Sequence, residues 1–320
     1  MTTEQAPKAS SPQAAGGDVQ PPFGGADSIF VGTNGIRAGW RILIFCLLTA
    51  GILVFVVGVV ALIPAFRNAL LALQAKGPIT PALLVFAEGG GAAAVLLAAA
   101  LMTRIEGRSF SDYGLPLNRS VAKLFALGLV TGFLSLSLLI GLIAGRHGYS
   151  AGSIALGPRD AVKYGLQYAI AFLLVGIFEE FTFRGYLQYT LGSGIGFWVA
   201  AIILAIVFGA AHLSNPGEAK FGALMAGAFG LVAVFSLWRT GSLWFAIAMH
   251  TAWDWGETFF YSVPDSGVMA RGHLLDASFH GPKWLTGGSV GPEGSILVFP
   301  VLVIWALAIH WMFPARRSAA

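Results

Sequence analysis

The stretch YGLQYAIAFLLVGIFEEFTFRGYLQYTL, residues 164–191, decides the fold class, because it is a long apolar run with charged side chains near its centre. A bilayer core about 30 Å thick is crossed by a helix of roughly 20 apolar residues whose backbone hydrogen bonds close within the segment. The stretch is long enough for such a helix, yet it contains Glu179, Glu180 and Arg184. We therefore expect a membrane-spanning helix whose charged groups are shielded from lipid.

The whole chain has the composition of a membrane protein. Of its 320 residues, 56% are hydrophobic and 11% are charged, whereas a soluble domain carries about a quarter charged residues. The net charge of +4 does not indicate a nucleic-acid partner, because the Lys and Arg residues lie mostly in short connections between apolar runs. The single cysteine, Cys46, excludes an intrachain disulfide and a cluster of several thiolates around a metal.

Eight apolar segments predict an all-α fold, a polytopic transmembrane helical bundle with about eight spans. The segments are residues 40–66, 79–102, 121–144, 164–191, 195–212, 221–238, 243–261 and 296–313. An even number of spans places both termini on one side, and the distribution of Lys and Arg favours the cytoplasm for that side. We expect a multi-pass protein of the cell (inner) membrane.

The chain divides into a tail and one membrane domain. Residues 1–36 are rich in Pro, Gly, Ala, Gln and Ser without an apolar period, which predicts a disordered N-terminal tail. Residues 37–320 form one predicted transmembrane domain, and its helices within 164–261 contain charged or ionisable side chains. The long connection 262–293 is expected to be a surface loop. Small residues in the second and sixth segments predict interior helices.

Polar side chains recur in three of the predicted spans. Besides the glutamates and Arg184, Phe208 precedes His212 by four residues, and His250 precedes Asp254 by four. A charged group costs about 2.5–3.5 kcal/mol at the centre of a membrane helix, so the four charged side chains would together cost on the order of 10 kcal/mol facing lipid. They are therefore expected to face one another or enclosed water.

Helical spacing assigns different roles to the two glutamates. Glu180 and Arg184 share one helix face and can form an ion pair, whereas Glu179 is rotated about 100° away and stays available for chemistry. His250 and Asp254 have the same four-residue spacing, so the aspartate can accept a ring N–H, or both groups can approach one cation.

These groups are the components of a hydrolytic site. Glu179 is the candidate general base that takes a proton from water, while the histidines can hold the water, bind a metal or stabilise an oxyanion. The competing interpretation is structural, because membrane histidines and Glu–Arg pairs also serve as interhelical contacts. Glu88 in the second span either lines the cavity or reaches water.

The three polar segments resemble a known family, the CAAX-protease and bacteriocin-processing (CPBP, also called Abi) intramembrane metalloproteases, and are similar to the type II CAAX prenyl endopeptidase. The family motifs are Glu-Glu-x-x-x-Arg, Phe-x-x-x-His and His-x-x-x-Asn/Asp. They match, in this order, at Glu179, Glu180 and Arg184, at Phe208 and His212, and at His250 and Asp254. The motif order makes the resemblance specific over residues 164–257.

The resemblance implies an eight-helix fold and a cavity within the membrane, where Glu179 activates water for peptide-bond hydrolysis. It implies that His212 and His250 complete the site and that Phe208 and Asp254 support it. Because an ionised Asp donates no hydrogen bond, Asp254 is expected to orient His250 or hold a cation, rather than act as an oxyanion donor. Two histidines and one glutamate also match the three-ligand arrangement of catalytic zinc, so Glu179, His212 and His250 are the candidate ligands of a divalent metal.

The sequence thus predicts an intramembrane endopeptidase, in which residues 37–320 are the transmembrane protease domain and its catalytic helices lie within 164–261. Two functional alternatives stay open. An ion- or proton-coupled transporter would use the same buried groups as a relay, and a non-catalytic immunity or scaffold protein would retain the fold alone. The expected partners are membrane lipids and a peptide or protein substrate, lipidated or not. Substrate identity and oligomeric state are not predicted.

Overall fold

The structure is a computed structural model that describes residues 29–32, 35–64, 67, 68, 71, 80–215, 217 and 219–314. Helices dominate this part of the chain, and the sheets in it are two antiparallel pairs of two-residue strands. The strands are β1 (Val31–Gly32) with β2 (Gly35–Ile36), and β3 (Tyr149–Ser150) with β4 (Ser278–Phe279). The predicted all-α fold class is confirmed.

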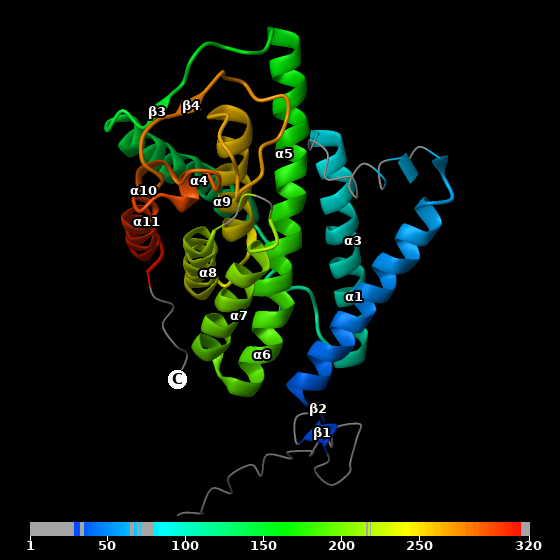
Figure 1. Cartoon of the computed structure of the whole chain (residues 1–320). Coiled ribbons are helices and arrows are strands. Elements are labelled where there is room, and N and C mark those ends of the chain that lie inside the picture. The colour runs from blue at the N-terminus through cyan, green and yellow to red at the C-terminus, as the bar shows by residue number, and fades with distance from the viewer. Residues whose placement is uncertain are drawn as a thin grey trace, which may run out of the picture.

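The helices follow the predicted apolar segments. Their bounds are α1 Ala38–Val60, α3 Pro81–Glu106, α4 Val121–Ala144, α5 Pro158–Glu180, α6 Leu187–Ile195, α7 Phe197–His212, α8 Lys220–Thr240, α9 Trp244–Trp255, α10 Lys283–Thr286 and α11 Val298–Met312, with π-helices η1 Phe181–Tyr186 and η2 Gly256–Phe260 and a 3-10 turn η3 Pro292–Gly294. In Figure 1, α5 runs through the height of the bundle, with α1 and α3 on one side of it and α4, α8, α9 and α11 on the other.

In the part of the chain that the structure describes, five helical stretches are long and apolar enough to cross a membrane, and shorter apolar helices lie at two more of the predicted segments. The five stretches are α1, α3, α4, α8 and the continuous stretch of α5, η1 and α6. Helices α7 and α11 are apolar but have only 16 and 15 residues, short of the roughly 20 that a crossing takes. The apolar segments of the sequence are longer than the helices because they also include residues of the turns at their ends. For example, Gly196 has φ +91°, a conformation outside the helical range, and α7 begins at the next residue.

Helix α9 lies at the centre of the bundle, and every residue from Phe245 to Asp254 is buried. Glycines let its neighbours approach closely. A Cβ added to Gly132 of α4 would lie 2.3 Å from the carbonyl oxygen of Met249, and one added to Gly176 of α5 would lie 2.9 Å from that of Ile247. Because protein surrounds α9, its polar side chains are kept away from lipid.

The small-residue helix α8 is an interior helix, as predicted. In α8, 61% of the residues in an apolar stretch of 18 are buried inside the protein. The corresponding value for α3, the other helix expected to be interior, is 33%. The close neighbour of α8 is α7, where a Cβ on Gly209 would lie 2.3 Å from the carbonyl oxygen of Ala223. Such close backbone contact places the end of α7 against the middle of the bundle.

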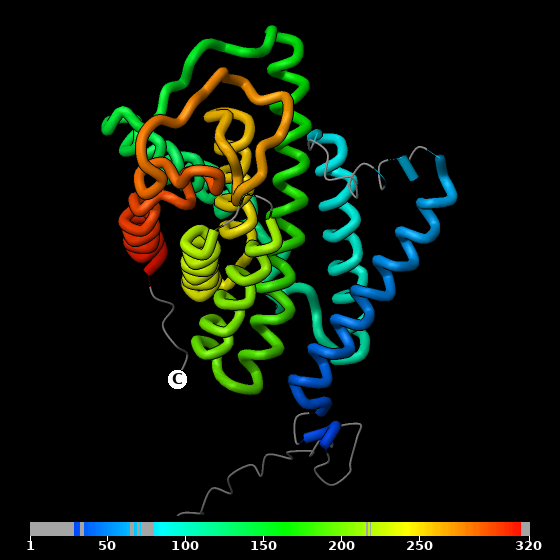
Figure 2. The backbone as a smooth tube through the Cα atoms, in the orientation of Figure 1, coloured from blue at the N-terminus to red at the C-terminus, as the bar shows by residue number. Residues whose placement is uncertain are grey.

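The long connection is a surface loop only in part, which corrects the expectation. Figure 2 shows residues 261–297 arching over the end of α9, and Val263 and Ala270 within it are buried. The loop is attached by backbone hydrogen bonds from Val263 to Glu257 and from Leu274 to Phe259. Of the predicted disordered tail, residues 1–28 lie outside the described residues, and the part that follows contains β1 and β2.

Candidate active site

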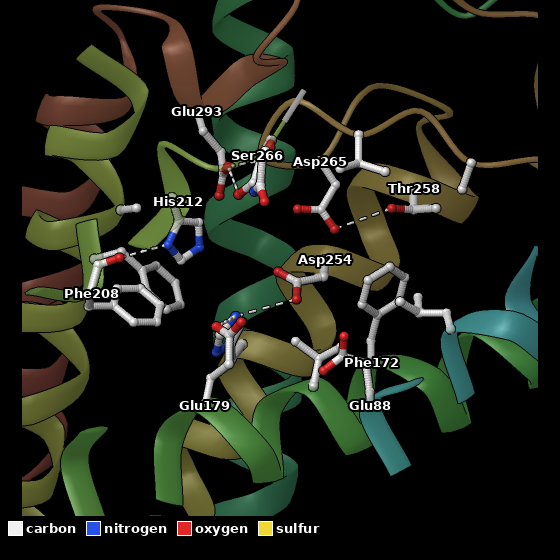
Figure 3. Close-up of a pocket in the computed structure, with 18 residues that line it drawn as sticks. Glu88, Phe172, Glu179, Phe208, His212, Asp254, Thr258, Asp265, Ser266 and Glu293 are labelled. Carbon is white, nitrogen blue, oxygen red and sulfur yellow. Dashed lines mark hydrogen bonds and ion pairs between the residues drawn. The ribbon is translucent and has the colours of Figure 1, made fainter. Parts of the chain in front are cut away.

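A cavity of about 250 Å³ opens between the helices beneath this loop. Five of the residues predicted for the site line it, namely Glu179, Phe208, His212, His250 and Asp254. They come from α5, α7 and α9, and Figure 3 shows the labelled side chains converging on one space. The fold therefore brings together groups that lie far apart in the sequence.

Glu180 and Arg184 form the ion pair that their spacing predicts. Nη1 of Arg184 lies 3.1 Å from Oε1 of Glu180, and the side chains are 3% and 0% exposed. Immediately after Glu180 the helix widens into the π-helix η1, which contains Arg184. Such π segments occur mainly as single turns within α-helices and are frequent at functional sites.

His250 is held by a carboxylate that the sequence did not assign to it. Its Nδ1 lies 2.8 Å from Oε1 of Glu180 and donates to it, while its Nε2 lies 3.3 Å from Oδ2 of Asp254 and 3.7 Å from Oε2 of Glu179. Spacing along one helix suggested that Asp254 fixes the imidazole tautomer. In the structure Glu180 does this from the neighbouring helix, and Asp254 faces the other ring nitrogen.

Glu179 keeps a free position in the cavity. Its side chain is 23% exposed there, and among the described residues its Oε2 has no hydrogen-bond donor. Glu88 of α3 lines the same cavity, so of the two alternatives for this residue the structure shows the first. Glu88 and Glu179 thus both border the cavity that His250 also lines.

The second histidine is held at the end of α7 by the aromatic ring one turn earlier. Nδ1 of His212 lies 2.8 Å from the carbonyl oxygen of Phe208, which makes Nδ1 the donor and leaves Nε2 for another partner. The ring centroids of Phe208 and His212 are 4.5 Å apart. The guanidinium carbon of Arg184 lies 3.9 Å from the Phe208 centroid, so one ring contacts both a cation and an imidazole of the site.

The loop supplies cavity residues that sequence reasoning missed. Asp265, Ser266 and Glu293 line the wall together with Thr258 of η2. Ser266 donates through its backbone N and its Oγ to Oε2 of Glu293, at 3.1 and 2.6 Å, and Thr258 donates to Asp265 at 3.3 Å. Burial, followed by the charges of Asp254 and Glu293, raises the pKa of Asp265 well above its usual value.

Neither helical spacing nor hydropathy could predict that these loop residues line the cavity, because their positions depend on how the connection itself is folded. Gly291 adopts φ +100°, and a Cβ there would lie 2.0 Å from the carbonyl oxygen of Pro264. This close approach brings the segment before Glu293 against the segment before Asp265. The motif Gly291-Pro292-Glu293-Gly294 was visible in the sequence, but nothing in it indicated a partner.

The side chains that lie close enough together to bind one metal ion are not the ones that the sequence suggested. In the described part of the chain, the three acidic or imidazole side chains whose ligand atoms lie within 4.8 Å of one another are Glu257, Asp265 and Glu293. The predicted set of Glu179, His212 and His250 is not such a group, although its donor atoms suit zinc.

A bundle of apolar helices around a cavity of carboxylates and imidazoles defines the class of this protein, an integral membrane protein of the polytopic α-helical type. Residues 162–256 match the family model described as type II CAAX prenyl endopeptidase Rce1-like, so this segment is similar to that family. The match contains all three polar motifs, covers less than a third of the chain and confirms the predicted resemblance. No curated protein and no solved structure matches the chain.

Proposed function

We propose that the protein is an intramembrane endopeptidase that hydrolyses a peptide bond of a membrane-associated peptide or protein. The observation that carries this proposal is the position of the Glu179 carboxylate, whose Oε2 lies 3.7 Å from Nε2 of His250 in a cavity between the helices. The match to an endopeptidase family over residues 162–256 supports the same reaction class.

In the proposed reaction Glu179 takes a proton from a water molecule in the cavity. The water oxygen forms the new bond to the carbonyl carbon of the scissile peptide. The Nε2–H groups that His212 and His250 carry when their rings are protonated stabilise the negative charge that develops on the carbonyl oxygen. Glu179 then returns the proton to the nitrogen as the C–N bond breaks. The products are a carboxylic acid and an amine, and the glutamate is regenerated.

Glu180, Arg184 and Asp254 act as positioning residues in this proposal. The Arg184 guanidinium neutralises the charge of Glu180, and the Glu180 carboxylate accepts a hydrogen bond from Nδ1 of His250. Nε2 of His250 therefore points to the cavity. Asp254 accepts hydrogen bonds but donates none when ionised, which favours orientation of His250 over contact with the oxyanion.

A divalent metal bound by Glu179, His212 and His250 is a separate proposal, and the reaction steps above do not depend on it. Two imidazole nitrogens and a carboxylate are ligands that zinc accepts, and zinc would supply a polarised water or carbonyl. The three side chains would have to come closer together than they are in the structure.

The proposed setting is the cell (inner) membrane with both termini in the cytoplasm. Figure 1 shows that α1 begins and α11 ends toward the same end of the bundle, which supports this placement of the termini. The outer face of α1 is apolar and exposed, for example at Val54 (74%) and Phe55 (70%), which favours contact with lipid. The substrate is a lipidated or unmodified segment that enters the cavity from the membrane or its surface.

A cleavage assay tests the function. The full chain is purified in detergent and incubated with a library of quenched fluorescent peptides, with and without a prenyl group. We expect cleavage by the wild type and its loss in Glu179→Gln, with an unchanged unfolding temperature in that variant. Substrate-independent proton or ion flux in liposomes, without any cleavage, would instead favour a transporter.

A further inference from the structure

A second group of carboxylates lies at the cavity wall, apart from the residues assigned to the reaction: Asp265 and Glu293 line the cavity, and Glu257 is buried behind them. Glu257 belongs to η2, Asp265 to the long loop and Glu293 to the turn η3. One carboxylate oxygen from each lies within 4.8 Å of the other two. In Figure 3, Asp265 and Glu293 point inward from the loop side of the cavity.

Glu257 is the member of this group that most needs a partner. The residue is 0% exposed, and in the described part of the chain neither of its carboxylate oxygens accepts a hydrogen bond. The indole N–H of Trp253, one turn earlier on α9, also has no hydrogen-bond partner among the described residues. It therefore does not donate a hydrogen bond to Glu257. A carboxylate that is buried without a donor or a counter-charge is unfavourable.

The surroundings of the group add negative charge rather than compensating it. Asp254 lies one turn before Glu257 and also contributes negative charge to it, while His250 is engaged by Glu179, Glu180 and Asp254. Within the described ranges, none of the three carboxylates forms an ion pair with a Lys or Arg. The site therefore lacks a cation that the protein itself supplies.

We propose that Glu257, Asp265 and Glu293 bind a hard divalent cation of the Ca²⁺ or Mg²⁺ type. All three ligands are oxygens, which hard cations prefer over zinc and other softer metals. Ca²⁺ accepts oxygens at about 2.3–2.6 Å, so oxygens on opposite sides of the ion are roughly 5 Å apart. Three carboxylate oxygens that all lie within 4.8 Å of one another can therefore approach one Ca²⁺ ion.

Such an ion would attach the loop to the central helix. The two loop segments are already joined to each other, because Gly267 donates to the carbonyl oxygen of Val290 at 2.8 Å and Ser266 donates to Glu293. The cation would add a link from these segments to Glu257 and so hold the wall of the cavity in place. The inference concerns a binding site and does not depend on the proposed peptidase activity.

Thermal unfolding of the full chain in detergent tests the proposal. The protein is stripped with EDTA, and its unfolding temperature is measured after addition of CaCl2, MgCl2 or ZnCl2. At one hundred times the dissociation constant, Ca²⁺ or Mg²⁺ is expected to raise the unfolding temperature of the wild type by about 5 °C or more. Glu257→Gln and Glu293→Gln should lose this rise.

The matched control is Asp276→Asn. Asp276 lies in the same loop and accepts a hydrogen bond from Ser153 at 2.9 Å, but it is exposed and outside the carboxylate group. This variant should keep the full rise with Ca²⁺ or Mg²⁺. In EDTA, Glu257→Gln should unfold at the wild-type temperature or above it, because the substitution removes repulsion from an empty site.

Three results would overturn the proposal. They are an equal rise in Glu257→Gln, no rise with either hard cation, and a rise with zinc alone. If Glu257→Gln does not yield folded protein, equilibrium dialysis with radioactive Ca²⁺ replaces it. One ion per wild-type chain and at least tenfold weaker binding by Glu293→Gln support the site, whereas the absence of bound ion in the wild type excludes it.

Discussion

Glu180 and His250 are 70 residues apart in the chain, yet Nδ1 of His250 donates to Oε1 of Glu180 over 2.8 Å. The same carboxylate oxygen accepts from Arg184. One buried oxygen therefore connects the ion pair within α5 and η1 to the imidazole of α9, and any change in the pair is transmitted to the cavity.

Removal of one member of the buried pair should destabilise the protein. In Glu180→Gln the guanidinium of Arg184 stays buried without its counter-charge, and loss of one partner of such a pair costs about 3–5 kcal/mol. Thermal or denaturant unfolding in detergent measures this loss. An unchanged unfolding temperature would show that the pair does not stabilise the fold.

Replacement of both members separates stability from positioning. In the double variant Glu180→Met with Arg184→Met, no charge of the pair is left without its partner, so the loss of unfolding free energy should be smaller than in Glu180→Gln and limited to about 1–3 kcal/mol for the buried N–H of His250. His250 nevertheless loses its acceptor, and we expect the peptidase kcat to fall by about 10- to 100-fold. Full activity in this variant would contradict the positioning role of Glu180.

Gly230 of α8 provides the space that Arg184 occupies. A Cβ at this position would lie 2.2 Å from Nη2 of Arg184, so Gly230→Ala should displace the guanidinium and cost about 1–3 kcal/mol of stability. Gly141→Ala in α4 is the matched control, because nothing lies within 4 Å of the added Cβ there. The control should stabilise its helix by about 0.5–1 kcal/mol, and the same unfolding assay compares the two variants.

Phe208 should matter because its ring contacts both Arg184 and His212. Phe208→Leu removes the cation–π contact and the support of the imidazole, which should lower stability by about 1–2 kcal/mol and reduce kcat more than it raises KM. Phe235→Leu is the control, since that ring faces Arg239 at 5.7 Å and does not line the cavity. Equal kinetic effects of the two substitutions would count against a role for Phe208 in the site.

Peptide cleavage is expected to survive a zinc-selective chelator. Glu179, His212 and His250 are not gathered around one point in the described structure, and the proposed steps need only water and these side chains. Cleavage is measured after dialysis against 1,10-phenanthroline, with metal analysis of the same sample. Loss of activity that Zn²⁺ restores, together with loss of bound zinc in His212→Ala, would establish a catalytic metal instead.

The sequence by itself determined the fold class and five of the helix residues that line the cavity, but not the cavity residues of the loop. A long apolar run of this kind crosses lipid as a helix, because a helix forms all of its backbone hydrogen bonds within the segment. Charged side chains within such runs, for example Glu179 and Asp254, therefore have to face the interior of the protein. The ion pair of Glu180 with Arg184 followed as well, because both residues lie on one helix, where spacing alone sets distance.

The tertiary structure alone decided which groups meet across helices. Spacing along α9 suggested Asp254 as the acceptor for the imidazole of His250, whereas the approach of α5, permitted by Gly176, places Glu180 at Nδ1. The loop residues Asp265 and Glu293 joined the cavity because Gly291 allows two distant loop segments to touch. Periodicity describes neighbours within one element, but contacts between elements depend on packing, which no local pattern in the sequence encodes.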